Sequence, residues 1–199
     1  MSDIGENYNY LEWVEEQRIN NSEEQFNMIS NFSCGDKKFG EEADLDAFLK
    51  YNAYNHDDDA LGNTYLIIDK EYNEIIAYYT LRCNSFHIKD CINKTMEAIP
   101  TVEIARLAVS KEYQNQSWGT AILGYFICDK IKKIAKMAAV KCIMVFVDGD
   151  DKRAIHFYRK FGFELCGDEI QNYISDSFNN DCGCKLMTVA LNDVRNLEV

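Results

Sequence analysis

The stretch from Val102 to Ala121 limits the folds open to this chain more than any other part. Residues 102–109 are apolar and β-branched enough for a buried strand. A polar loop follows at 110–118, and a long helical pattern opens at Thr120. The first turn of a helix has unpaired N–H groups and a dipole that favours negative charge. The sequence therefore predicts an α/β protein with a site for a phosphate-bearing ligand at residues 114–120, which we call the anion loop.

Hydrophobic spacing predicts the elements before this stretch. Apolar residues recur at helical intervals in two segments, and two strand-like runs separated by a short polar turn indicate a hairpin. Pro100, the only proline, is expected just before the central strand. Expected in order are a helix at 8–19, a strand at 25–32, a helix at 45–53, strands at 64–69 and 74–81, and an unpatterned connection at 84–100.

The same reasoning predicts the elements after the loop. Isoleucines and alanines at spacings of three and four indicate a long helix with one buried face. The continuous apolar run at 141–147 is typical of a strand buried on both faces. Expected in order are a helix at 120–139, the strand at 141–147, a helix that begins near Asp151 and ends at Gly162, and closing strands at 163–167 and 185–191.

Length and composition bound the class of protein. A chain of 199 residues with 47% hydrophobic content is long enough for one domain with a full core. We expect an acidic N-terminal extension at 1–24 and a single domain at 25–199. No run reaches the length of a membrane span, and the polar, acidic N-terminus resembles no targeting peptide, so a cytoplasmic protein without membrane contact is expected. In that reducing compartment the eight cysteines are interpreted as small core residues.

The charge is distributed unevenly and bears on the partner. Residues 1–62 hold 15 acidic and 4 basic residues, a net charge of −11, and residues 63–199 hold 18 and 17, a net charge of −1, which sum to the −12 of the whole chain. An acidic surface repels nucleic acid and attracts cations, although solubility alone is another reading. Nucleic acid is therefore disfavoured but not excluded, because a basic patch could restore binding: Lys132, Lys133, Lys136, Lys152 and Arg153.

Two clusters raise the question of a metal. The run His56-Asp57-Asp58-Asp59 offers ligand types, but a solvated loop after a helix is the favoured interpretation. Cys182 and Cys184 form a close pair without two further grouped ligands, and the three histidines are scattered. We predict no metal.

The anion loop resembles a known signature. Gln114-x-x-Ser117-x-Gly119 is similar to the Q/R-x-x-G-x-G/A motif of the GNAT acetyltransferase superfamily, with Ser117 where the first glycine usually stands. A serine keeps the N–H donor but restricts φ, so the cradle is expected to survive if this position has a negative φ. The resemblance implies that the loop holds the pyrophosphate of acetyl-CoA as a cosubstrate, through Gln114, Asn115, Gln116, Ser117, Trp118, Gly119 and Thr120.

A second resemblance follows one helix and one strand later. The pattern Asp151-x-x-Ala154-x-x-Phe157-Tyr158, ending in Gly162-Phe163, is similar to the N-x-x-A-x-x-[FL]-Y-x-x-x-GF segment of GNAT enzymes. It implies the GNAT fold, a mixed central sheet with a splay after the fourth strand and flanking helices. It also implies that Asp151, in place of the usual asparagine, contacts the pantetheine arm. Backbone groups exposed by the splay would bind that arm and polarise the thioester at Leu107, Ala108 and Val109.

The resemblance also implies roles in catalysis. Tyr158 matches the tyrosine credited with protonating the departing thiolate, and a phenol is protonated at neutral pH. Packing in an aromatic helix is its alternative role. Glu103 is the candidate base, acting through a water, because a carboxylate alone is too weak a base for an ammonium. Its alternatives are a strand residue facing solvent or a partner of Arg106.

A third resemblance is narrower and concerns the acceptor. The segments Phe32-x-Cys34-Gly35, Ile76 to Leu81 and Ala105 to Val109 look like GNAT toxins of toxin–antitoxin modules, which acetylate the amino acid of charged tRNA. Those toxins are typically basic, whereas this chain is acidic. We therefore expect an N-acetyltransferase acting on a primary amine of a small molecule or protein, with charged tRNA as the alternative acceptor. The sequence does not decide the oligomeric state, and a homodimer is one possibility.

Overall fold

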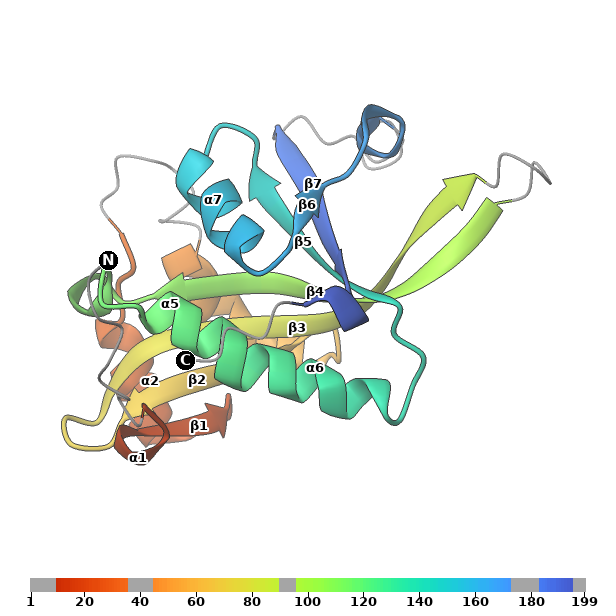
Figure 1. Cartoon of the computed structure of the whole chain (residues 1–199). Coiled ribbons are helices and arrows are strands. Elements are labelled where there is room, and N and C mark those ends of the chain that lie inside the picture. Colours follow the sequence, from red (N-terminus) through yellow and green to blue (C-terminus); the bar gives the residue numbers. More distant parts are fainter. Residues whose placement is uncertain (1–9, 36–44, 90–95, 173–182, 195–199) are drawn as a thin grey trace. The chain divides into compact units, whose positions relative to one another are not determined.

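The computed structural model describes residues 10–35, 45–89, 96–172 and 183–194 (Figure 1). Their strands form one mixed seven-stranded sheet in the order β1-β2-β3-β4-β5-β7-β6, which confirms the predicted fold class. The chain divides into two compact units, which we call unit 1 (residues 1–81 and 106–126) and unit 2 (residues 82–105 and 127–198). Strands β3 (Glu74–Lys89) and β4 (Met96–Val109) contribute residues to both units.

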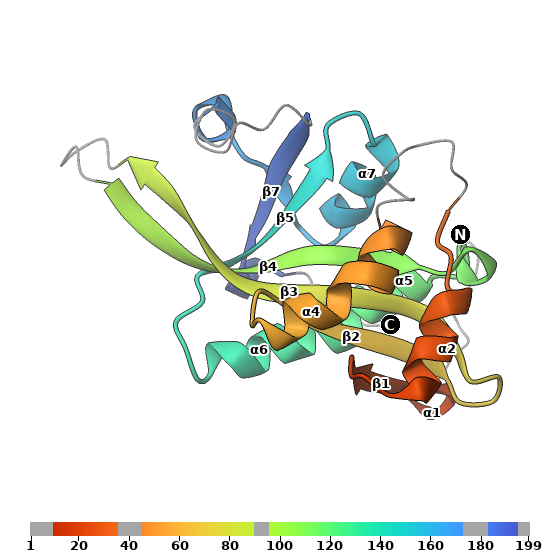
Figure 2. The same ribbon diagram turned by 180° about the vertical axis from the view of Figure 1, so that it is seen from behind.

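Unit 1 contains an antiparallel sheet with helices on both faces. Strand β1 pairs with β2, and β2 pairs with the first half of β3. Figure 2 shows α2 and α4 on one face of β2 and β3, and Figure 1 shows α5 on the other. Its elements are α1 (Tyr10–Trp13), β1 (Val14–Arg18), α2 (Glu23–Asn31), η1 (Phe48–Asn52), α4 (Ala53–Asp58), β2 (Asn63–Asp69), η2 (Lys111–Tyr113), α5 (Trp118–Ala121) and the start of η3 (Ile122–Ile127).

The core of unit 1 forms where the helices α2, η1 and α4 cover the sheet. Apolar residues one helical turn apart on α2 and η1 contact alternate residues of β2 and β3. A helix repeats about every 3.6 residues and a strand every 2, so these residues share one face of each element. The predicted helix at 45–53 and the predicted hairpin are confirmed. The buried cluster comprises Ile19, Met28, Ile29, Phe32, Cys34, Phe48, Leu49, Ala53, Leu66, Ile68, Ile75, Tyr78 and Ala108.

The two N-terminal predictions were wrong. Residues 14–18, expected in a helix, form edge strand β1, because backbone pairing with β2 outweighs their local helical spacing. Residues 23–31, expected to be mostly strand, form helix α2, whose first turn is capped by Ser22 accepting from the Gln25 N–H. Strand β1 is thus part of the sheet, while the domain boundary between residues 24 and 25 stays a prediction.

The connection predicted at 84–100 is largely strand. Strand β3 continues to Lys89 and β4 begins at Met96, so that Pro100 lies inside β4 rather than before it. Among its described residues, Ile99 is buried but Phe86 and Ile88 are only half-buried, which explains why the apolar pattern was weak. Residues 90–95, also part of that prediction, lie outside the described residues.

Unit 2 is built around β5, which is buried along most of its length, as predicted. It pairs antiparallel with β7 throughout and parallel with β4 only from Thr101 to Glu103. The β4–β5 ladder ends there, which agrees with the predicted splay. Elements of this unit are α6 (Cys128–Ala135), β5 (Cys142–Asp148), α7 (Lys152–Lys160), β6 (Glu164–Leu165), β7 (Cys184–Ala190) and η4 (Leu191–Asp193).

Two further expectations concern cysteines and membranes. Cys34, Cys128 and Cys142 are buried free thiols, as predicted, whereas Cys83 is exposed. In the part of the chain that the structure describes, no helix is both long enough and apolar enough to span a bilayer.

Candidate active site

The anion loop has an unusual backbone. Asn115 and Ser117 lie in the left-handed region, with φ of 61° and 63°, and α5 begins directly afterwards at Trp118. The condition of a negative φ at Ser117 is therefore not met. Left-handed residues interspersed in a loop turn successive N–H groups towards one side and make a concavity for anions. The loop thus keeps the backbone shape for which glycine is usually selected, at the cost of strain on a serine.

Gln114 holds the base of this loop. Its side-chain amide donates to the carbonyl oxygens of Cys34 and Val109, the latter at 3.0 Å. The Ser110 N–H donates to the Ile76 carbonyl at 2.7 Å and so joins the end of β4 to β3. The side chain of Gln114 is therefore engaged with protein, and what the loop offers a ligand is its backbone N–H groups.

The end of β4 presents the three residues predicted to meet the pantetheine. Ala108 is buried in the core of unit 1, while Leu107 and Val109 are partly exposed. The Val109 carbonyl already accepts from Gln114, so only part of this segment's backbone is available to a ligand.

Glu103 does not face solvent, and Arg82 is an ion-pair partner of its carboxylate. It is 2% exposed and forms a bidentate ion pair with Arg82, at 2.7 and 2.8 Å. Asn84 donates a third hydrogen bond to the same carboxylate. Arg82 and Asn84 were missed by sequence reasoning, although their spacing of two residues placed them on one face of a strand. The three contacts link β3 to β4 within unit 2, and a base role for Glu103 stays a prediction.

Tyr158 lies on α7 among aromatic rings. Its ring packs edge-on against Phe157 and Phe163, with centroids 5.0 and 5.4 Å away. Burial raises the pKa of Tyr158 above its ordinary value, because the phenolate would lose its solvation. The arrangement gives a packed aromatic ring whose hydroxyl keeps its proton.

Asp151 begins the same helix. Its Oδ1 accepts from the N–H groups of Arg153 and Ala154 at 2.9 and 3.1 Å, which is an N-cap. Aspartate caps this helix as an asparagine could, and the predicted pantetheine contact stays a prediction.

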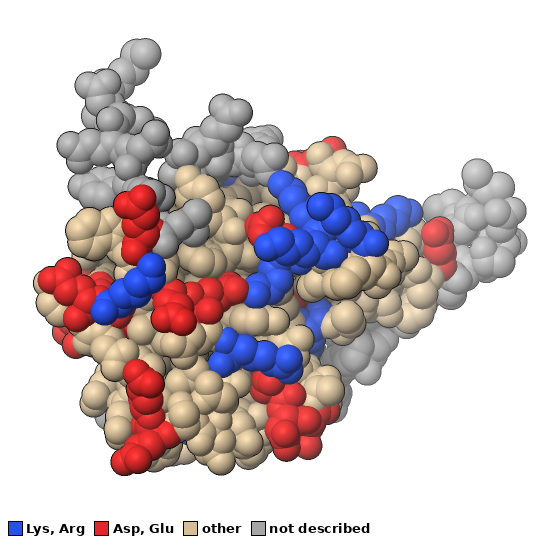
Figure 3. Space-filling view, turned by 90° about the horizontal axis from the view of Figure 1, so that it is seen from below, with Lys and Arg blue, Asp and Glu red and all other residues tan. Residues whose placement is uncertain are grey.

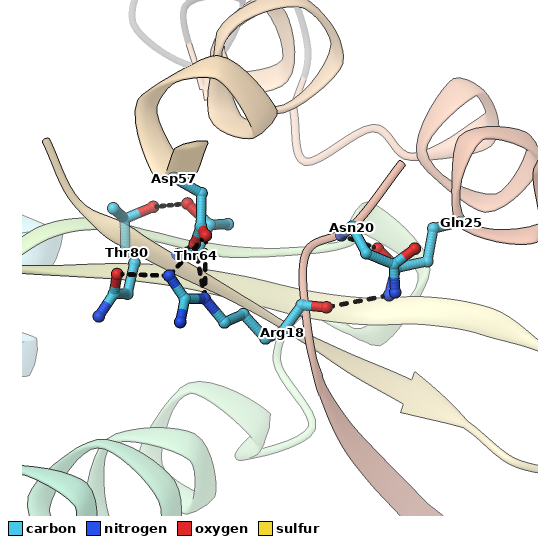
Figure 4. Close-up of polar contacts among 7 residues, drawn as sticks. Arg18, Asn20, Gln25, Asp57, Thr64 and Thr80 are labelled. Atoms are coloured by element: carbon cyan, nitrogen blue, oxygen red, sulfur yellow. Dashed lines mark hydrogen bonds and ion pairs between the residues drawn. The ribbon is translucent and has the colours of Figure 1, made fainter. Parts of the chain in front are cut away.

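Most of the acidic run at 56–59, expected as a loop, is helical, because residues 56–58 end α4 and Asp59 is its C-cap. Asp57 pairs with Arg18 of β1 at 2.7 Å and also accepts from the Thr64 N–H (Figure 4). Thr64 in turn shares a buried hydrogen bond with Thr80. This network ties α4 to the sheet. No group of three potential metal ligands occurs within the described ranges.

Comparison with known proteins decides the family. A model of the acetyltransferase (GNAT) family matches residues 26–163, more than half of the chain. The chain belongs to the GNAT family of acetyltransferases. The motifs at Gln114–Thr120 and Asp151–Phe163 both fall inside the matched segment, and the predicted enzyme class, an N-acetyltransferase, is confirmed. No curated protein sequence matches this GNAT chain.

Solved structures similar to this acetyltransferase include bacterial toxins. AtaTR bound with acetyl-CoA has a TM-score of 0.68 and 17% identity, covering 91% of this chain and 95% of that one. AtaT complexed with acetyl-methionyl-tRNAfMet has a TM-score of 0.67 and 16% identity, covering 90% and 95%. A tyrosine-to-phenylalanine mutant of KacT has a TM-score of 0.66 and 18% identity, covering 90% and 96%. At these identities the likeness establishes the GNAT fold.

Proposed function

We propose that this protein transfers the acetyl group of acetyl-CoA to a primary amine, in the cytoplasm. The observation that carries the proposal is the anion loop, whose left-handed residues precede the helix that begins at Trp118. Such a loop offers backbone N–H groups to a pyrophosphate. The acetyl-CoA bound to AtaTR, a structure of the same fold, supports the choice of cosubstrate.

The proposed reaction is a direct transfer. The neutral amine nitrogen attacks the thioester carbonyl, the C–S bond breaks, and the nitrogen loses a proton to a water or base. Tyr158 gives its proton to the departing thiolate. A backbone N–H in the segment Leu107–Val109 polarises the carbonyl oxygen. Holding the two reactants together supplies much of the rate, because the transfer then costs little further entropy.

The acceptor that the charge favours is a cationic small molecule or protein amine. Unit 1 has a cavity of about 530 Å³ beside the start of the anion loop. Among the described residues, its lining includes the carboxylates Glu24, Glu74 and Glu112, the cation Lys111, and the buried side chains Met28, Phe32 and Ile75. An ammonium group would be stabilised in such a cavity.

Charged tRNA is the second candidate acceptor. AtaT, which has the same fold, was captured with acetyl-methionyl-tRNAfMet. Basic side chains also gather over α6 in unit 2 (Figure 3), where Lys132, Lys133 and Lys136 are exposed. Phosphates are bound through such clusters.

A panel assay decides between these acceptors. Purified protein is incubated with labelled acetyl-CoA and, separately, with polyamines, lysine-rich peptides and charged tRNA. Acetylation of a polyamine or peptide with none of charged tRNA supports the first candidate. Acetylation of charged tRNA, together with arrest of protein synthesis on expression, supports the second and overturns the first.

The cosubstrate is tested by Gly119→Trp, measured by calorimetry with CoA. Gly119 lies in the first turn of α5, so an indole there should obstruct the approach of a pyrophosphate to the loop. We expect loss of CoA binding with an unchanged circular dichroism spectrum. Equal affinity in the variant and the wild type would show that the loop is not the coenzyme site.

A further inference from the structure

The anion loop and the turn before it are hydrogen-bonded to Ser33 and Cys34, which follow the C-cap residue of α2, Phe32. The Lys111 N–H donates to the Ser33 carbonyl at 2.9 Å, and the Gln114 amide donates to the Cys34 carbonyl. Figures 1 and 2 show this segment beside the loop before α5. The Ser33 carbonyl is thus bonded to η2, directly before the anion loop, and the Cys34 carbonyl to the first residue of the loop, Gln114.

A single carboxylate holds the other side of the same two residues. Asp46 Oδ1 accepts from the Cys34 N–H at 2.8 Å, and Asp46 Oδ2 accepts from the Ser33 hydroxyl at 2.9 Å. Charge-assisted hydrogen bonds of this kind are stronger than neutral ones. Asp46, Ser33–Cys34 and Gln114 therefore form one continuous chain of hydrogen bonds within unit 1.

Asp46 is itself held in place. It lies in a helical segment that continues through η1, and the preceding residue, Leu45, accepts a hydrogen bond from the Tyr78 hydroxyl at 2.8 Å. Tyr78 is fully buried on β3. The chain of hydrogen bonds thus runs from the buried core of unit 1 to the anion loop.

We propose that Asp46 is a positioning residue that holds the anion loop in its coenzyme-binding shape. The loop needs such support, because Asn115 and Ser117 occupy a strained backbone region that persists only where the surroundings enforce it. Without Asp46, Ser33 and Cys34 lose the carboxylate that holds them, so the Cys34 carbonyl that anchors Gln114 is less fixed and only the Gln114 bond to Val109 stays unaffected. The loop then spends less time in the binding shape. Apparent affinity falls in proportion to that population. The inference rests on the proposed function.

Calorimetry with CoA tests it on the full chain. Asp46→Ala is expected to raise the Kd for CoA about tenfold, a shift in the range of measured couplings between sites. Asp46→Asn, which keeps an oxygen for the Cys34 N–H and an amide for the Ser33 hydroxyl, should bind nearly as the wild type does. Asp58→Ala is the matched control, because Asp58 is exposed on the same run of helix.

A double-mutant cycle separates positioning from general loss of stability. If Asp46 acts through Gln114, the double variant Asp46→Ala/Gln114→Ala should bind CoA no more weakly than the worse single variant. If the increase in Kd in the double variant equals the product of the two single increases, the two residues act independently and the proposal is overturned. So would a Kd for Asp46→Ala equal to that of the wild type.

Two safeguards keep the result interpretable. If Asp46→Ala does not fold, Ser33→Ala removes one of the two hydrogen bonds and should still raise the Kd for CoA about twofold to threefold, on the order expected for one such bond. An unchanged Kd in folded Ser33→Ala then overturns the proposal. A wild-type protein that binds no CoA overturns the proposed function instead.

Discussion

Ser117 is the residue at which local backbone preference and the proposed function conflict most. Its φ of 63° is one that an L-residue adopts at a cost of about 1–2 kcal/mol, whereas glycine adopts it freely. The strain sits in the loop that we propose to hold the coenzyme, and strained residues often cluster at binding sites.

Ser117→Gly should therefore stabilise the protein by up to about 1 kcal/mol, once the greater freedom of glycine in the unfolded chain is subtracted. Urea unfolding measures the change. Ser110→Gly is the matched control, because Ser110 has a φ of −52° and gains nothing from glycine. Destabilisation by Ser117→Gly as large as that by Ser110→Gly would contradict the strain.

Tyr158 is the residue on which the chemistry depends most directly. Tyr158→Phe should lower kcat about a hundredfold or more, as for loss of a general acid, and leave CoA affinity nearly unchanged. Single-turnover kinetics and calorimetry give the two values. Wild-type turnover in the variant, measured where chemistry limits the rate, would leave Tyr158 with a packing role only.

The pH profile provides a second measurement on Tyr158. Burial raises its pKa above the ordinary value of about 10, so the proton remains on the hydroxyl as pH rises through the neutral range and beyond. Tyr158 should therefore still carry its proton between about pH 8 and 9, and activity should not fall in that range because of Tyr158.

At the scale of elements, β3 and β4 are joined in unit 2 by the ion pair of Arg82 and Glu103. Glu103 is buried, while the Arg82 side chain is 44% exposed. Loss of Arg82 leaves the carboxylate with Asn84 as its remaining hydrogen-bond donor among the contacts described above.

Arg82→Ala should reduce the free energy of unfolding by about 2 kcal/mol, less than the loss of a fully buried pair because water reaches Arg82. Denaturant unfolding measures it, with Arg82→Lys, which keeps the charge, as the milder comparison. A change below about 0.5 kcal/mol, the range of ordinary surface substitutions, would mean that the pair does not stabilise β3 against β4.

At the scale of the whole molecule, the net charge of −12 acts on any charged acceptor. If the acceptor is a polyamine, kcat/KM should fall severalfold between about 50 and 200 mM salt, because salt screens the attraction that brings a cation to an acidic surface. An uncharged analogue should show little salt dependence. A rate on polyamines that is insensitive to salt would contradict electrostatic attraction.

The sequence by itself determined the second half of the fold and the family. The β4–loop–α5 stretch, β5 and α7 were predictable because each is local: apolar periodicity, a turn and a helix end lie within a few residues of one another. The anion loop and Tyr158 were found for the same reason, since their motifs are contiguous.

Only the tertiary structure decided the rest. Strand β1 is a strand because β2 pairs with it, and a pairing partner some fifty residues away leaves no local pattern. Glu103 pairs with Arg82 because β3 and β4 are neighbours in the sheet, and this contact joins residues 21 positions apart, so no local pattern shows it. The backbone of Ser117 and the support of Gln114 by Cys34 and Asp46 likewise depend on contacts between distant segments, which side-chain identity alone does not encode.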